Sequence, residues 1–183
     1  DAGLESIDRD ATALPAHQVA LIRAVCAANP RTVVVLNVAH PVDTGCLADA
    51  AAVMVVWYPG QEFGPALASV LAGDREPGGR LPVTFAQRLD DYPVRSLTPD
   101  AAGDLWYHER QQVGYRWFNA RERPAAWAFG HGLGYADITL IAAALTGDEV
   151  DALQLRCRLE NRAARAGKAV VQLYLRGPET AWS

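Results

Sequence analysis

Three ionisable side chains crowd into five positions near the start of the sequence. Glu5, Asp8 and Arg9 lie in "LESIDRD", just before a segment with helical spacing. Carboxyl groups at such positions can donate and accept protons in catalysis. The residue types leave two interpretations open, a solvated chain end and half of an active site.

A second group of polar residues follows a predicted strand. In "WYPGQEF", Gln61 and Glu62 precede a helical pattern, and free backbone N–H groups at a helix start favour a carboxylate. Two roles are open for Glu62: it caps or tethers the loop, or it contacts a substrate directly.

The two loop histidines have no recognisable catalytic partner. His40 precedes a proline and His131 lies between two glycines, so solvated or backbone-bonded roles are favoured over catalytic ones. There is no G-x-S-x-G, P-loop or G-x-G-x-x-G motif, which leaves serine hydrolase and nucleotide-binding functions without support.

The segment "YHERQQVGYRWF" predicts a strand that carries polar and aromatic side chains, namely Tyr107, Glu109, Tyr115 and Arg116. An arginine near a carboxylate is usually structural. Tryptophans such as Trp106 pack in cores or loops by default, although exposed aromatic faces also stack on sugar rings.

The elements that position these residues follow an α/β order. Helical spacing predicts a helix from Ala16 that stops before Asn29 and Pro30. Continuous apolar runs predict buried parallel strands over residues 32–38 and 51–58, with a loop and a short helix between them. Another helix should follow and close at Gly73. This alternation is typical of an α/β sheet, whose ligands bind beyond the carboxyl ends of the strands.

The later part of the chain differs in composition and in the period of its apolar residues. Glycine, proline and aromatic residues between residues 75 and 135 predict ordered loops. From Ile138, partial two-residue alternation predicts antiparallel strands in "ITLIAAAL", "ALQLRCRLENR" and "KAVVQLYLRG". Three strands are too few for an independent sandwich, so an all-β module that is cut short is expected.

Composition excludes several functions. The net charge of -4, with 17 lysines and arginines in no run, lacks the basic footprint of a nucleic-acid or membrane-surface binder. No apolar stretch reaches the roughly 18 residues of a membrane span. Three scattered cysteines fit no disulfide framework or zinc motif, and neither a metal nor a cofactor is expected.

Four segments together carry a family resemblance. "LESIDRDATALPAHQVALIRAVCAANPRTVVVLNVAHPV", "WYPGQEFGPALASVLAGDREPGGRLPVTF", "VGYRWF" and "FGHGLGY" resemble, in order and spacing, the C-terminal region of glycoside hydrolase family 3. The tail "RLENRAARAGKAVVQLYL" is similar to the fibronectin type III-like domain that follows in many members.

The resemblance implies a fold and a division of the chain. The fold class is α/β: a three-layer α/β sandwich, incomplete at its N-terminus, over residues 1–136. A truncated all-β, immunoglobulin-like or fibronectin III-like module should occupy residues 137–183. Family members also have a (β/α)8-type barrel, and this chain is expected to be a fragment whose barrel is missing. Localisation is left open.

The resemblance also answers the opening question. Members hydrolyse non-reducing β-glycosides with retention, and "L-E-S-I-D-R" aligns Glu5 with their general acid/base. Asp8 and Arg9 then form an ion pair that fixes the acid loop, while the nucleophile comes from the barrel. Two positions depart from the family pattern. Ser6 stands where glycine is usual after the acid, and Arg110 follows Glu109 where the family typically has glycine after glutamate. A β-linked glycoside is the expected partner, and a catalytically silent carbohydrate-binding or interaction module is the alternative.

Overall fold

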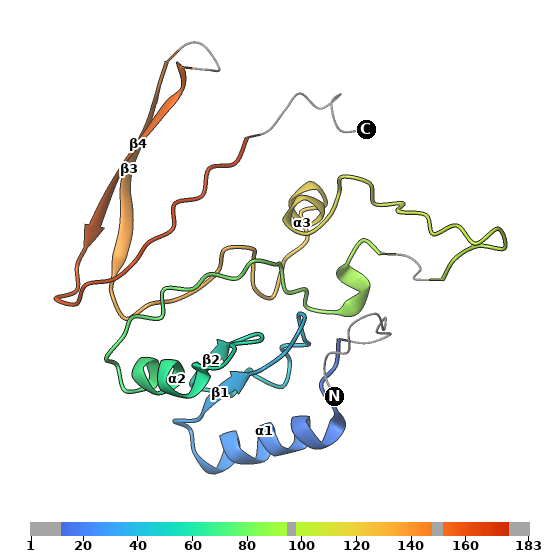
Figure 1. Ribbon diagram of the computed structural model, residues 1–183, viewed down its shortest axis with the longest axis horizontal. Coiled ribbons are helices and arrows are strands. Elements are labelled where there is room, and N and C mark those ends of the chain that lie inside the picture. Colours follow the sequence, from blue (N-terminus) through green and yellow to red (C-terminus); the bar gives the residue numbers. More distant parts are fainter. Residues whose placement is uncertain (1–11, 95–97, 148–151, 176–183) are drawn as a thin grey trace. The chain divides into compact units, whose positions relative to one another are not determined.

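Figure 1 shows the computed structural model of the chain, which describes residues 12–94, 98–147 and 152–175. The predicted site residues Glu5, Asp8 and Arg9 lie outside the described residues. In chain order the elements are α1 (Ala16–Ala28), β1 (Val33–Leu36), β2 (Ala52–Val55), α2 (Phe63–Leu71), the 3-10 helix η1 (Leu89–Asp91), α3 (Tyr115–Ala120), β3 (Ile138–Thr146) and β4 (Gln154–Asn161).

The chain divides into two compact units. The first unit contains Asp1–Gly60, Leu81–His131 and Leu175–Ser183, and the second contains Gln61–Arg80 and Gly132–Tyr174. The boundary expected between residues 136 and 137 therefore remains a prediction about domains, because these units include residues from both sides of it. Among the described residues, every helix falls short of the length and apolar character needed to cross a membrane.

Helix α1 in the first unit has the bounds that its sequence predicts. It starts after Pro15, whose carbonyl accepts hydrogen bonds from the first turn, and it ends where the N–H of Asn29 donates to the Val25 carbonyl at 2.9 Å. Its apolar positions Val19 and Ile22 pack against the core. The helix is therefore held by one face, as the spacing of its apolar residues requires.

The two predicted strands pair in parallel, but the burial on both faces that their apolar runs predict is wrong, because Leu36 alone of their residues is buried. The register runs from Val33 opposite Ala52 to Leu36 opposite Val55. Both strands are shorter than the predicted ranges 32–38 and 51–58, because only four residues of each form the ladder. The apolar residues beyond the ladder enter the core from loops instead.

One aromatic residue lies at the centre of the first unit. Phe85 is 0 % exposed, and its ring centroid is 5.1 Å from that of Trp127 and 6.1 Å from that of Trp57. Phe85 and Trp127 also form an isolated antiparallel bridge. The surrounding core consists of Leu14, Leu36, Val38, Val42, Cys46 and Leu47.

Two local predictions for this unit are wrong. Residues 39–50 contain turns and no helix; Pro41 and Gly45 interrupt the segment, and Val42 reaches the core from the loop. The strand predicted over residues 107–118 is also absent, and α3 occupies its end. Trp117 and Phe118 are both buried in one cluster, which a helix turn permits and a strand, with alternating faces, does not.

The second unit contains α2 and an antiparallel hairpin. Helix α2 closes at Gly73, whose φ of 84° is the left-handed conformation of a helix end. Strands β3 and β4 pair from Ile138–Asn161 to Thr146–Gln154, with an irregularity between Leu140 and Ala142. The third predicted strand is not formed over its described residues, 168–175. This segment does not pair with β3 or β4.

Candidate active site

The carboxyl ends of β1 and β2 form one edge of the parallel pair. The N–H of Val56 continues the ladder by donating to the Leu36 carbonyl at 2.9 Å, and Trp57 follows at once. Trp57 has a φ of 50°, a conformation that a bulky side chain rarely adopts. Its ring packs on the core, and the packing offsets the strain. The chain therefore changes direction directly after β2, at the edge where ligands bind in open parallel sheets.

The loop after β1 holds the first described residue of the chain. The N–H of Asp43 donates to the Thr12 carbonyl at 3.0 Å, and the Thr12 hydroxyl donates to the Asp43 carboxylate. Two residues further on, Leu14 is 8 % exposed and belongs to the same core as Val42. The segment that follows the predicted acid residues is thereby attached to the end of β1.

A half-buried tyrosine, Tyr92, lies within electrostatic range of Asp43 in this loop. The Tyr92 hydroxyl accepts a hydrogen bond from the Ala86 N–H at 3.0 Å and donates one to the Thr84 carbonyl at 3.2 Å. Burial is the main reason that the pKa of Tyr92 is raised, and the negative charge of Asp43 raises it further. Tyr92 is therefore a neutral structural group at the pH of most enzyme reactions.

The predicted residues at the start of α2 are exposed. Glu62 is the N-cap residue of the helix, but its side chain makes no capping hydrogen bond, so the capping interpretation is wrong. Its backbone carbonyl accepts from Ala66 N–H at 3.1 Å, as in any helix start. Gln61 is exposed beside it. A direct contact of Gln61 and Glu62 with a substrate stays a prediction.

The histidines behave as loop residues. His40 Nδ1 lies 2.8 Å from the Pro41 carbonyl, which identifies Nδ1 as the protonated nitrogen and confirms the backbone-bonded role. His40 Nε2 is buried without a partner among the described residues. His131 is exposed, and its backbone carbonyl accepts from Leu81 N–H at 2.8 Å.

The loop before α3 carries an exposed but oriented indole. Trp106 is 63 % exposed, and its N–H donates to the Asp100 carboxylate at 2.9 Å. The other carboxylate oxygen accepts from the backbone N–H groups of Ala102 and Asp104. These contacts, with the indole contact first, lower the pKa of Asp100. The sequence leaves core packing, loop packing and sugar stacking open for Trp106, and its exposure excludes core packing alone.

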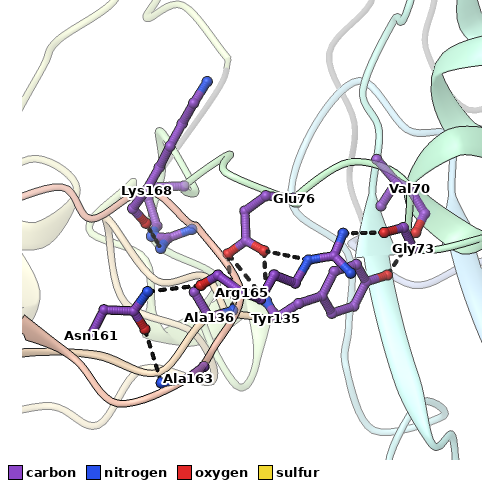
Figure 2. A network of polar contacts seen from close by, with 10 residues as sticks. Val70, Gly73, Glu76, Tyr135, Ala136, Asn161, Ala163, Arg165 and Lys168 are labelled. Carbon is purple, nitrogen blue, oxygen red and sulfur yellow. Dashed lines mark hydrogen bonds and ion pairs between the residues drawn. The ribbon is translucent and has the colours of Figure 1, made fainter.

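Glu76 is the centre of a polar network in the second unit (Figure 2). Its carboxylate accepts from the Tyr135 N–H at 3.0 and 3.1 Å and from the Ala136 N–H at 3.3 Å, and it pairs with Arg165 at 3.9 Å. Arg165 also donates to the Gly73 carbonyl, and its guanidinium lies 4.9 Å from the Tyr135 ring centroid. The carboxylate thus joins the loop after α2 to the segment before β3 and to the turn after β4.

Two glycines leave the space that this carboxylate fills. A Cβ atom at Gly134 would collide with Glu76 Oε1, and one at Gly167 would lie 2.9 Å from the same oxygen. Sequence reasoning missed the network, although the glycines of "FGHGLGY" were a signal of a close approach. Glu76 is a structural carboxylate, since protein groups satisfy it.

The described residues offer no metal site. No group of three or more histidine, cysteine, aspartate or glutamate side chains could hold a metal ion within the described ranges. Cys26 and Cys46 are buried free thiols and Cys157 is half-buried.

The parallel strand pair and its motif-bearing loops agree with one family. Residues 2–135 match the glycosyl hydrolase family 3 C-terminal domain. The chain therefore belongs to glycosyl hydrolase family 3.

Its relatives include beta-glucosidases. The chain is 43 % identical over 180 residues to a beta-glucosidase of Rhizobium radiobacter, covering 95 % of this chain and 22 % of that protein. It is 36 % identical over 173 residues to a beta-glucosidase of Kluyveromyces marxianus, covering 93 % of this chain and 20 % of that protein. The chain spans about a fifth of the length of these curated relatives.

Solved structures show the same relationship. The beta-glucosidase DesR from Streptomyces venezuelae, in complex with D-glucose, matches with a TM-score of 0.82 at 36 % identity, over 91 % of this chain and 22 % of that one. The GH3 beta-glucosidase of Bifidobacterium adolescentis matches with a TM-score of 0.82 at 29 % identity, over 92 % of this chain and 27 % of that one.

Proposed function

We propose that this chain is the acid-supplying part of a retaining β-glucosidase that hydrolyses non-reducing β-glucosides. The observation that carries the proposal is the family match over residues 2–135, which includes the motif "LESIDR". The β-glucosidase relatives at up to 43 % identity support glucose as the sugar. The rest of a longer parent protein supplies the barrel and the nucleophile.

Glu5 is the general acid/base in this proposal. A retaining glycosidase needs a carboxylate nucleophile and a protonated acid about 5 to 5.5 Å apart. Glu5 protonates the leaving oxygen and then activates water against the glycosyl-enzyme. Asp8 and Arg9 hold its loop as an ion pair, and Gln61 and Glu62 contribute contacts on the substrate side.

The fold assignment is extended in the same way. We propose that β1, β2 and the elements around them belong to a three-layer α/β sandwich of which this chain contains part. The β3–β4 hairpin belongs to a fibronectin III-like module. The parallel register of β1 with β2 and the antiparallel register of β3 with β4 support these two assignments.

The test is the dependence of the rate on the leaving group in the full-length parent. Glu5→Gln should slow hydrolysis of alkyl β-glucosides by about 10²- to 10⁴-fold, the usual contribution of a general acid. Formation of the glycosyl-enzyme from dinitrophenyl β-glucoside should change far less, because that leaving group needs no proton. Glu160→Gln, at an exposed glutamate, is the control. An equal loss for both substrates would refute the assignment.

A silent carbohydrate-binding module is the second candidate. The exposed Trp106, oriented by Asp100, favours it because a fixed aromatic face can stack on a sugar ring. Binding of cello-oligosaccharides by the parent without any turnover would support this alternative and contradict the enzyme.

A further inference from the structure

Asp43 and Thr12 form a two-way contact between segments that are distant in the sequence. The backbone N–H of Asp43 donates to the Thr12 carbonyl at 3.0 Å, and the Thr12 hydroxyl returns a bond to the Asp43 carboxylate. The contact uses both the backbone and the side chain of each residue. It therefore fixes the orientation of the Thr12 segment as well as its distance from the loop.

Both partners of the contact rest on the buried core. On one side, Leu14 is 8 % exposed; on the other, Val42 is 3 % and Leu47 is 4 % exposed, and all three belong to one cluster. The loop that carries Asp43 is further closed by the bond from Leu47 N–H to the Thr44 carbonyl at 2.9 Å. The anchor is thus tied to close-packed residues, which transmit a displacement instead of absorbing it.

The place of the anchor in the chain gives it a functional meaning. Thr12 comes seven residues after Glu5 in the sequence, so the chain limits the Glu5 backbone to within about 25 Å of Thr12, and the anchor holds Thr12 beside Asp43. Asp43 follows β1, at the edge of parallel strands where ligands bind. An anchor at this point therefore fixes where the acid-bearing segment joins that edge.

We propose that Asp43 is a positioning residue for the segment that carries the general acid. It acts through Thr12 and does not touch the substrate. This inference rests on the proposed function, since it assigns Asp43 to the reaction in which Glu5 is the acid. Its role is to keep the acid in line with the leaving oxygen, where small displacements are costly.

The test compares variants of the full-length parent on two substrates. Asp43→Ala and Thr12→Val each remove the hydrogen bond between the Thr12 hydroxyl and the Asp43 carboxylate. Thr12→Val keeps Asp43 itself, so it tests the proposal even where Asp43→Ala does not fold. Each should lower kcat for an alkyl β-glucoside by about 10- to 100-fold, the cost of misplacing a reacting group by about 1 Å. With dinitrophenyl β-glucoside as substrate, formation of the glycosyl-enzyme in a pre-steady-state burst should change much less, and KM should stay nearly constant.

Two controls separate positioning from general structural damage. Asp49→Asn changes an exposed aspartate of the same loop and should leave both rates unaltered. Thr12→Ser keeps the hydroxyl and should restore the rate on the alkyl glucoside. Equal losses on both substrates, a change in KM alone, or failure of serine to restore the rate would overturn the role of Asp43.

Glu5→Gln is measured beside these variants. If it shows the leaving-group dependence and the Asp43 and Thr12 variants do not, the positioning role is wrong and the proposed function stands. If Glu5→Gln shows no such dependence, the acid assignment and the positioning role are both refuted.

Discussion

Replacing Glu76 with alanine should open the junction between the loop after α2 and the β3–β4 hairpin. The Glu76 side chain is 12 % exposed and accepts hydrogen bonds from the backbone N–H groups of Tyr135 and Ala136. Its loss leaves these two donors without their charged partner. It also removes the carboxylate that pairs with Arg165, which keeps its contact with the Gly73 carbonyl.

The expected magnitude follows from these contacts. A hydrogen bond to a charged group contributes about 1.5–3 kcal/mol. The ion pair adds little, because Arg165 is 39 % exposed and its nitrogen is 3.9 Å from the carboxylate. Since contributions from one network are not additive, we expect the free energy of local unfolding to fall by about 2–3 kcal/mol, a roughly 30- to 150-fold increase in opening.

Amide hydrogen exchange measures this opening directly. In the Glu76→Ala variant, the amides of Tyr135 and Ala136 should exchange faster by that factor, whereas amides of β1 in the other unit should not. Glu160→Ala is the matched control, because Glu160 pairs with Arg162 at 3.1 Å while both side chains are about half exposed. That variant should change stability by less than about 1 kcal/mol. Equal effects of the two substitutions would refute the reasoning.

Three further results are expected. Gly134→Ala should destabilise the second unit because its methyl group collides with the clamped carboxylate, while Gly79→Ala, with open space around it, should not; thermal unfolding of both variants checks this. Because the pKa of Tyr92 is raised above its unfolded value of 10.0, the stability that its neutral form contributes is complete below pH 10 and is lost as the pH rises through the folded pKa. The fall in unfolding free energy between pH 9 and 11 should therefore be smaller in Tyr92→Phe, and an unchanged slope would contradict the burial argument. The pKa of Asp100 is lowered, so the hydrogen bonds to its carboxylate are complete above pH 3.8 and weaken as the pH falls through the lower pKa of the folded state. The fluorescence of Trp106 should change over this acidic range in the native protein and stay constant in Asp100→Asn.

Local patterns in the sequence predicted the regular elements well. The helical spacing and the Asn-Pro pair predicted both ends of α1, and the continuous apolar runs predicted the parallel pairing of β1 with β2. Two-residue alternation predicted β3 and β4 as an antiparallel pair. These elements are predictable because the period of the apolar residues is itself the geometry of a helix or strand.

The same patterns failed where packing decided the conformation. A short helix was expected within residues 39–50 and a strand over 107–118. The first segment forms turns and α3 occupies the end of the second, because Val42 and the adjacent Trp117 and Phe118 reach the core. Trp57 adopts a left-handed conformation that no propensity predicts, and its packing on Phe85 offsets the strain.

The candidate site divides in the same way. The residues of "LESIDR" by themselves left a solvated chain end and an active site open, and the family resemblance of this motif made Glu5 the candidate acid. The contact of Asp43 with Thr12 joins residues 31 positions apart, and that of Glu76 with Tyr135 joins residues 59 apart. No local pattern names the partner in either contact, since a hydrogen bond between distant segments forms only after the core has fixed where each segment lies; the glycines of "FGHGLGY" indicate a close approach but not the group that approaches. The sequence therefore determined the elements and the chemical groups, and the tertiary structure decided which of those groups hold one another in place.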